Sequence, residues 1–418
     1  MDINTQQNLL RLLLASDKKS VTLGLEIHRT NPTNESETLL KACLELYPKV
    51  FREEIDELEA THLLKLNTHS INLSNKITEL PKGIGQLINI QNLDLTYNKL
   101  TELPREIGQL ANLKNLDVSE NQLVELPQEI GQLTNLKNLN LSNNQLTQLP
   151  QEIGRLTNLQ KLKLTHNQFT QLPKEIERLT NLQDLNISYN QLNELPKEVG
   201  QLKNIQTLYL NRNQLTQLPK EIGQLVNLKD VDLGENPLTE LPIEIGQLTS
   251  IQRLGLFGTQ LTQLPKEIEQ LVNLNDLDLG GNPSLQLPNE LQKLLELKDL
   301  SLAGSQLTRL PDIVTNLVNL DILYLGGNRL VDFPREIKQL TNLRVLNLKD
   351  NQLTHLPIEI TQLVNLKKLH LWDNQLTTLP EEIQLLTNLE VLDLSDNPIP
   401  REQQVIIQKW LPNCDIEW

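Results

Sequence analysis

The sequence has few aromatic and few sulfur-containing residues. Its 418 residues include four phenylalanines, five tyrosines, three tryptophans, one methionine and two cysteines. Any hydrophobic core must therefore be aliphatic. The two cysteines, Cys43 and Cys414, stand near opposite ends of the chain. We expect no disulfide between them, and two free thiols are typical of a reducing compartment.

The sequence also lacks a long uncharged apolar run. The apolar stretch from Leu9 to Ala15 is interrupted by Arg11, and Asp2 stands where a signal peptide would carry positive charge. No stretch is long enough to span a bilayer as a helix. These features predict a cytoplasmic protein with no membrane insertion, although secretion by an unconventional route stays open.

Positive charge is in short supply. The chain has 53 acidic and 38 basic side chains, which gives a formal net charge of -15, and its pI is near 5.0. A surface with this balance repels phosphate backbones and anionic lipid. Nucleic acid is therefore not expected as a partner. The net negative charge favours a protein partner with a basic or apolar docking surface.

Motifs for catalysis and metal binding are missing as well. The sequence contains no phosphate-binding loop, no G-x-S-x-G motif and no C-x-x-C pair. Its six histidines never come at metal-ligand spacing: His28, His62, His69, His166, His355 and His370. We expect no catalytic residues, no metal site and no cofactor, and therefore a protein that is not an enzyme.

What the sequence does have is one phrase repeated along most of its length, of which residues 135–150 (NLKNLNLSNNQLTQLP) are a clear copy. One aliphatic position recurs every 23 residues without insertion or deletion, at Leu95, Val118, Leu141, Leu164, Ile187, Leu210, Leu233, Leu256, Leu279, Leu302, Leu325, Leu348, Leu371 and Leu394. Such regularity predicts a solenoid, in which each unit contacts only its neighbours.

Each recurring residue of the repeat has a physical role. Alternating leucines fix a short strand with one buried face. Asn144, at the strand end, can bond backbone groups that the turn leaves unpaired. Pro150 suits the first position of a short helical or 3₁₀ return segment. Two units earlier, Ile107, Leu110 and Leu113 are spaced to bury the return segment against the strands.

The unit L-x-x-L-x-L-x-x-N-x-L-x-x-L-P-x-x-I-x-x-L-x-x resembles the leucine-rich repeat family, in its 23-residue class common in bacterial proteins. The resemblance implies an α/β fold: a right-handed leucine-rich-repeat solenoid, shaped as a horseshoe or arc, with parallel strands on the concave face and helical caps at both ends. It also implies recognition of a protein partner through the concave face.

The pattern predicts three regions. Residues 1–65 form a helical N-terminal cap, with helices near 4–14, 21–28, 37–46 and 51–58 and with Ser36 capping the third. A small binding domain is the alternative for this region. Residues 66–397 form the solenoid of about 15 units. Residues 398–418 form a C-terminal cap, in which Val405, Ile406 and Trp410 share one side of a helix and an extended segment follows.

Residues that depart from the repeat are the candidates for partner binding. In the second half of the chain, large or charged side chains replace small polar ones at strand positions that face solvent: Tyr209, Arg212, Phe257, Ile322, Tyr324, Val345, His370 and Trp372. Exposed apolar groups on a polar surface are typical of docking sites.

The same half carries a stripe of small residues, including Gly258, Gly281, Gly304 and Gly327, and it replaces the repeat asparagine by Thr259 and Ser305. Either a partner approaches the backbone there, or duplicated repeats have drifted. Flanking carboxylates admit a cation site at Asp276, Asp278 and Asp299, but a solvated acidic face is favoured over it.

These observations together predict a protein–protein interaction module or scaffold with no catalysis of its own. Two other hypotheses stay open: an exported host-interaction or adhesion factor, and a non-catalytic subunit of an enzyme.

Overall fold

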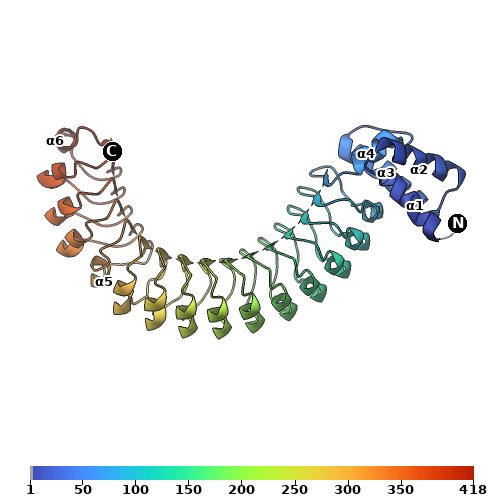
Figure 1. The fold of residues 1–418 in the computed structure, drawn as a ribbon. Coiled ribbons are helices and arrows are strands. Elements are labelled where there is room, and N and C mark those ends of the chain that lie inside the picture. The colour runs from blue at the N-terminus through green and yellow to red at the C-terminus, as the bar shows by residue number, and fades with distance from the viewer. Residues whose placement is uncertain (1–2) are drawn as a thin grey trace. The chain divides into compact units, whose positions relative to one another are not determined.

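The computed structural model describes residues 3–418. The chain forms two compact units, the first ending at Ile205 and the second running from Gln206 to Trp418. In each unit the strands lie along the inner, concave side of a curve and the 3₁₀ helices along its outer side (Figure 1). Strands stack at about 4.8 Å, and the return segments need more room, so each unit curves towards its strands.

The first unit begins with four helices: α1 (Ile3–Leu13), α2 (Lys18–Thr30), α3 (Asn34–Phe51) and α4 (Ala60–Leu66). Helix α3 starts at a capping box, but its N-cap is Thr33, whose hydroxyl accepts from the Ser36 N–H at 3.1 Å. In return the Ser36 hydroxyl, inside the helix, accepts from the Thr33 N–H at 3.0 Å. The prediction that Ser36 caps this helix was therefore wrong by one turn.

The helix predicted over residues 51–58 is absent. Helix α3 continues past Pro48 to Phe51 and ends at Arg52, which has a left-handed φ of 59° and donates its N–H to the Pro48 carbonyl. The residues that follow carry several carboxylates one turn apart, and like charges at that spacing disfavour a helix. The next helix therefore begins only at Ala60.

Six parallel strands follow in the first unit: β1 (Ser70–Asn72), β2 (Asn92–Asp94), β3 (Asn115–Asp117), β4 (Asn138–Asn140), β5 (Lys161–Lys163) and β6 (Asp184–Asn186). Their return segments are the 3₁₀ helices η1 (Lys82–Gln86), η2 (Arg105–Gln109), η3 (Gln128–Gln132), η4 (Gln151–Arg155), η5 (Lys174–Arg178) and η6 (Lys197–Gln201).

The second unit repeats this order in parallel register from β7 to β16. Its strands are β7 (Thr207–Tyr209), β8 (Asp230–Asp232), β9 (Arg253–Gly255), β10 (Asp276–Asp278), β11 (Asp299–Ser301), β12 (Ile322–Tyr324), β13 (Val345–Asn347), β14 (Lys368–His370), β15 (Val391–Asp393) and β16 (Asp415–Glu417). Its helices are η7 (Lys220–Gln224), η8 (Ile243–Gln247), η9 (Lys266–Gln270), η10 (Asn289–Lys293), α5 (Asp312–Thr315), η11 (Arg335–Gln339), η12 (Ile358–Gln362), η13 (Glu381–Leu385) and α6 (Arg401–Trp410).

The core of each unit is aliphatic, as the composition predicts. In the second repeat Leu116, Ile107, Leu110 and Leu113 are all buried. The repeat proline was predicted at the first position of the return helix. Instead Pro104 has an extended ψ of 147° and is the N-cap of η2, one position before the helix. Its carbonyl accepts from the Ile107 N–H at 3.0 Å. These parallel-strand units with helices at both chain ends confirm the predicted fold class.

The repeat asparagine has the predicted role. The Asn144 side chain accepts from the Leu123 N–H at 2.9 Å and donates to the carbonyls of Val118 and Leu141. It is buried, so its amide satisfies backbone groups that water cannot reach. One asparagine thus joins two successive turns of the solenoid.

A second asparagine ladder ties the solenoid to the N-terminal helices. The Asn135 side chain donates to the Ala111 carbonyl, 24 residues back, at 2.8 Å. At the first turn the ladder continues into the helices, because Asn89 Nδ2 lies 3.1 Å from the Leu14 carbonyl oxygen. The helical region therefore completes a hydrogen-bond pattern that belongs to the repeats.

The C-terminal helix spans the predicted residues but buries a different side. Ile407 is buried under α6, whereas Val405 and Ile406 are exposed, so the predicted apolar side was wrong. The extended segment expected after it is observed as β16, paired with β15. The boundaries predicted at 65 and 397 stay predictions.

Both cysteines are free and buried, and burial raises the pKa of the Cys43 thiol to about 12 and that of the Cys414 thiol to about 11. Across residues 3–418, none of the helices combines the length and the apolar character needed to cross a bilayer.

Candidate functional site

The inner surface of each unit is built from four columns of residues. In each strand a buried aliphatic residue is flanked by two residues that face solvent, as Arg253 and Gly255 flank Leu254 on β9. We call the residue before it the first column and the residue after it the second column. The third column lies two residues beyond the second, at Phe257 on this turn, and the fourth is the next residue, Gly258.

The second column usually has a structural role. On most turns it is an aspartate or asparagine whose side-chain oxygen accepts from the N–H two residues ahead. Asp232 bonds Gly234 in this way at 2.9 Å, and Asp278 bonds Gly280 at 3.0 Å. Asn140 makes the same bond to Ser142 in the first unit. The polar inner-face residues of the first unit are therefore partly parts of the fold.

Three predicted binding residues replace that structural side chain. Tyr209, Tyr324 and His370 occupy the second column on β7, β12 and β14. A tyrosine ring cannot accept the local backbone bond that aspartate or asparagine makes there, so the two tyrosines give up a net stabilisation of about 1 kcal/mol each. Lys163, Gly255 and Ser301 also stand in the second column without such a bond, so its loss agrees both with a binding role and with drift between duplicated repeats.

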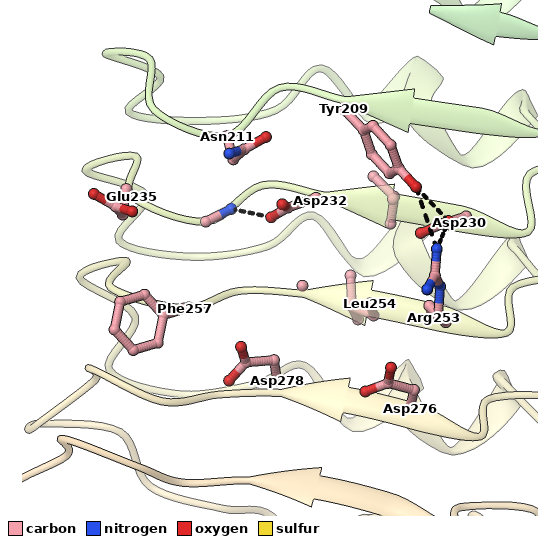
Figure 2. A pocket seen from close by; sticks show the side chains of 13 residues that line it. Tyr209, Asn211, Asp230, Asp232, Glu235, Arg253, Leu254, Phe257, Asp276 and Asp278 are labelled. Carbon is pink, nitrogen blue, oxygen red and sulfur yellow. Dashed lines mark hydrogen bonds and ion pairs between the residues drawn. The ribbon is translucent and has the colours of Figure 1, made fainter. Parts of the chain in front are cut away.

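A hollow of about 520 Å³ opens on the inner surface between β7 and β10. Figure 2 shows Tyr209, Asp230, Arg253 and Asp276 on one side of it and Phe257 on the other, with Asp232 and Asp278 between the two sides. Tyr209 and Phe257 were predicted binding residues. Arg212, also predicted, lies beside the hollow, where its Nε is 2.7 Å from Glu235 Oε1.

The charges on the first-column side of the hollow are paired. Arg253 forms an ion pair with Asp230, and the Tyr209 hydroxyl donates to Asp230 Oδ2 at 2.6 Å. Burial, followed by the hydrogen bond to Asp230, raises the pKa of Tyr209 to about 12. This tyrosine is therefore a neutral hydrogen-bond donor held in place by its own chain.

The other carboxylates of the hollow are poorly compensated. Burial is the main cause that raises the pKa of Asp232, and the nearby charge of Asp278 raises it further. Burial also raises the pKa of Asp276, which Arg253 offsets in part. On the neighbouring strand β11, outside the hollow, burial raises the pKa of Asp299 as well. This surface holds negative charge that the fold does not neutralise.

Backbone conformation explains several glycines of the small-residue stripe. The fourth column has a left-handed backbone on most turns, with φ of 63° at Gly258, 69° at Gly281, 65° at Gly304 and 69° at Gly327. Glycine adopts this conformation without a steric penalty. Gly280 stands in the third column and has a different reason, because a Cβ there would lie 2.9 Å from the Phe257 ring. The ring therefore packs over a backbone that has been cleared for it.

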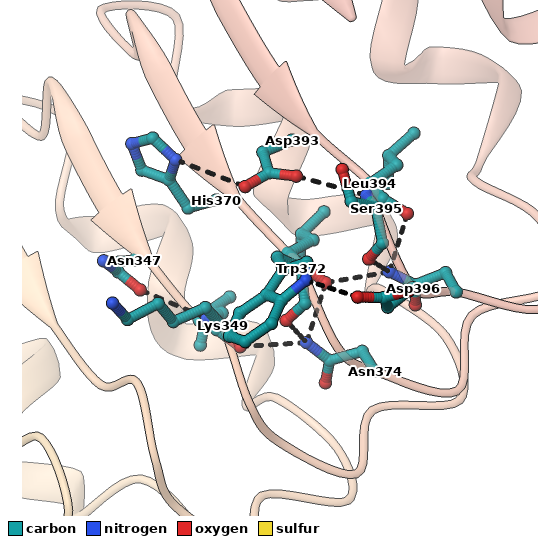
Figure 3. A network of polar contacts seen from close by, with 12 residues as sticks. Asn347, Lys349, His370, Trp372, Asn374, Asp393, Leu394, Ser395 and Asp396 are labelled. Carbon is teal, nitrogen blue, oxygen red and sulfur yellow. Dashed lines mark hydrogen bonds and ion pairs between the residues drawn. The ribbon is translucent and has the colours of Figure 1, made fainter. Parts of the chain in front are cut away.

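The remaining predicted residues lie further along the second unit. Ile322 and Tyr324 are on β12, Val345 pairs with Ile322 from β13, and His370 is on β14. Figure 3 shows Trp372 donating from its ring nitrogen to Asp396 at 2.7 Å and His370 directed at Asp393. The most exposed aromatic residues among the predicted set are Phe257 (43%), Tyr324 (39%) and Trp372 (37%).

All eight predicted residues thus lie in the second unit, in two groups: one around the hollow and one on β12–β14. Sequence reasoning missed Arg253. Its place 23 residues from both Asp230 and Asp276 could have shown it as a cation between two carboxylates. The cation site considered at Asp276, Asp278 and Asp299 is not formed, because no metal-binding group of three such residues exists within residues 3–418.

The inner surface of the first unit is different in kind. A hollow of about 590 Å³ lies over β1–β5 and is lined largely by amides and carboxylates. Asparagine side chains there bond one another from strand to strand, as Asn138 does to Asn115 and Asn115 to Asn92. Lys161 ends this row by pairing with Asp184 at 2.8 Å.

Family profiles match most of the chain. One described as "Leucine-rich repeat region" matches residues 44–141, 127–192, 178–257 and 244–350. Two described as leucine-rich repeats match residues 341–399 and 388–414. Comparison with curated proteins found no match.

Solved structures give the same answer. The leucine-rich repeat protein LIC12759 of Leptospira interrogans is 46% identical, with a TM-score of 0.72, over 84% of this chain and 96% of that one. The plant peptide hormone receptor RGFR1, solved in complex with RGF2, is 31% identical over 80% of this chain and 56% of that one, with a TM-score of 0.63. An internalin of Listeria monocytogenes, at 21% identity and a TM-score of 0.57 over 94% and 96% of the two chains, shares the fold.

The repeat, the asparagine ladders and these matches agree, and the chain belongs to the leucine-rich repeat family.

Proposed function

We propose that this protein is a scaffold that binds a protein partner on the inner surface of its second unit. The leucine-rich repeat fold is in general a protein-interaction scaffold. The observation that carries the proposal is the second column, where Tyr209 and Tyr324 replace a side chain that the fold uses to bond its own backbone. The proposal gives the chain no chemistry of its own.

The chemistry of the surface supports a partner with basic and apolar groups. Aspartates are the commonest solvent-facing residues of β8–β11. Strands β12 and β13 add apolar and aromatic side chains at Ile322, Tyr324 and Val345. Ile322, Val345, Tyr324 and Trp372 offer anchor area at low conformational cost, since aromatic rings have few rotatable bonds. A partner lying across these strands contacts both regions.

The test uses a substitution that repairs the fold while removing the binding side chain. Tyr324→Asn supplies an amide oxygen for the Gly326 N–H, as Asn347 does for the Lys349 N–H at 3.1 Å. Combined with Trp372→Ala, it should reduce partner recovery in a pull-down at least about tenfold, because a few aromatic residues carry most of the binding free energy of an interface. The retained protein is identified by mass spectrometry and its affinity remeasured with purified components.

Asn347→Ala is the matched control, because it removes the structural bond next to the aromatic group and leaves the rings in place. It should lower the unfolding temperature slightly and keep binding. Equal recovery of the purified partner by wild type and by the Tyr324→Asn/Trp372→Ala protein would refute the proposal.

We also propose a cytoplasmic location. Two buried free thiols, Cys43 and Cys414, support it. Cell fractionation with an antibody to the folded protein tests it, and recovery from the culture medium or the cell surface would favour an exported factor instead.

A further inference from the structure

The first column of the hollow alternates anion, cation and anion, whereas the second column has the two anions without the cation. In the first column Asp230, Arg253 and Asp276 sit opposite one another on β8, β9 and β10. The order is anion, cation, anion. Arg253 pairs with Asp230 and its charge also lowers the pKa of Asp276 against the effect of burial.

In the second column the middle member is missing. Asp232, Gly255 and Asp278 sit opposite one another on the same three strands. The two aspartates are two strand spacings apart, about 10 Å between backbones, and glycine puts no side chain between them. Arg253 does not fill the space, because its guanidinium turns to Asp230 and lies 3.2 Å from the Tyr209 hydroxyl. Figure 2 shows this separation.

The space beside Gly255 also has an apolar wall. Phe257 follows two residues later on the same turn, is 43% exposed, and lies against the bare backbone of Gly280. A guanidinium is planar, donates along two edges and stacks on an aromatic face, whereas an ammonium does not match that geometry. An arginine can therefore satisfy two carboxylates and the ring together.

We propose that the protein partner inserts an arginine side chain over Gly255, between Asp232 and Asp278 and against Phe257. It completes in the second column the arrangement that Arg253 makes in the first. This inference rests on the proposed function, and it names the charge complementarity through which the partner is recognised.

The probe is a fluorescein-labelled pentapeptide, acetyl-Ala-Ala-Arg-Ala-Ala-amide, whose binding to the full chain is measured by fluorescence anisotropy. Its matched control carries citrulline, which keeps the shape of arginine and removes the charge. A third peptide carries lysine. We expect the arginine peptide to bind at least about threefold more tightly than the citrulline peptide, and the lysine peptide to fall between them. Equal binding of the arginine and citrulline peptides overturns the proposal.

The protein variants keep the fold intact. Asp232→Asn with Asp278→Asn retains the backbone bonds, since Asn140 makes the same bond at this position. This double variant should lose the preference for arginine. The control is Asp94→Asn with Asp117→Asn, the same change in the same column of the first unit, and it should bind as wild type does. Undiminished arginine preference in the first variant, or an equal loss in the control, contradicts the inference.

Gly255→Arg places the chain's own cation in the gap and should abolish peptide binding. The introduced Cβ meets the Asp232 carboxylate at 2.8 Å, which a side-chain rotation relieves. If the Asp232→Asn/Asp278→Asn protein binds the natural partner fully while the Tyr324→Asn/Trp372→Ala protein does not, the arginine site fails and the proposed function stands. If neither variant loses the partner, both proposals fail.

Discussion

The Thr259 hydroxyl donates to Asn282 Oδ1 at 2.7 Å, a bond between two buried side chains at the same position of successive repeats. On most turns this position is an asparagine whose side-chain oxygen accepts from a backbone N–H of the turn before, as Asn144 does from Leu123. The reason for the exchange lies on that turn, at Pro237. Proline has no N–H for the ladder, and the Leu238 N–H bonds instead to the Asn236 carbonyl at 2.8 Å. The proline removes the need for an asparagine on the next turn, and the threonine takes its place there.

We predict that Pro237→Gln and Thr259→Asn are coupled. Glutamine is the residue at the corresponding place on regular turns, where the Gln145 N–H donates to the Leu123 carbonyl at 2.9 Å. The double variant should be more stable to denaturant than the sum of the single variants by about 1 kcal/mol. Additive effects in the three denaturation curves would show that the two residues are independent.

The contact between η1 and α3 should be intolerant of one methyl group. A Cβ at Gly83 would lie 2.0 Å from the Cβ of Ala42. Gly83→Ala should cost about 1–3 kcal/mol, as overpacking does, and Ala42→Gly in the same chain should restore part of it. Thermal unfolding followed by circular dichroism measures both, with Lys82→Ala as a surface control. No rescue by Ala42→Gly would mean that the cost arises elsewhere.

Two glycines of the fourth column should differ in their response to alanine. Gly281 and Gly304 share a left-handed backbone, so each alanine costs about 1 kcal/mol from conformation. A Cβ at Gly281 would also lie 2.9 Å from the Gly258 nitrogen, whereas at Gly304 the nearest neighbour is 3.9 Å away. Gly281→Ala should therefore lower the unfolding temperature by several degrees more than Gly304→Ala. Equal losses would leave the backbone angle as the whole cause.

Asp232→Asn should stabilise the protein at neutral pH. Burial first, and then the Asp278 charge, raises the pKa of Asp232 above its usual value. A carboxyl group with a raised pKa supports the fold while protonated and opposes it once pH rises through that pKa. The asparagine protein should therefore unfold about 1–2 °C higher at pH 7, and the gain should disappear as pH falls below the pKa of a free aspartate. A gain that persists unchanged at pH 3 would rule out this electrostatic cause.

Much of the architecture could be predicted because each repeat contains the same local instructions. The buried leucine, the strand-ending asparagine and the proline recur at 23-residue spacing, and each acts on the turn next to it. The helical region was harder. Residues 51–58 have apolar spacing typical of a helix, but a left-handed turn at Arg52 and closely spaced carboxylates decide against it. The apolar side of α6 was also misjudged, because three adjacent apolar residues do not show which one meets the core.

The candidate binding residues could be picked out of the sequence for the same reason: a departure from a regular pattern is visible. Tyr324 and Trp372 stand out against aspartate, asparagine and serine. Arg253 did not stand out, because a charged residue at a solvent-facing strand position is ordinary until its neighbours across the sheet are known. The glycines stood out, but their left-handed backbone at Gly258 and Gly281 could not be seen in the letters.

The amino-acid sequence alone determined that this protein is a stack of parallel strands with an aliphatic core, because that core is specified by contacts within one repeat and between adjacent ones. Only the tertiary structure decided which inner-face side chains bond their own backbone and which face the hollow. Asp232 accepts a hydrogen bond from its own backbone two residues ahead, which is local. That it also faces Asp278 across Gly255 depends on residues 23 and 46 positions further along the chain being brought side by side by the strand register.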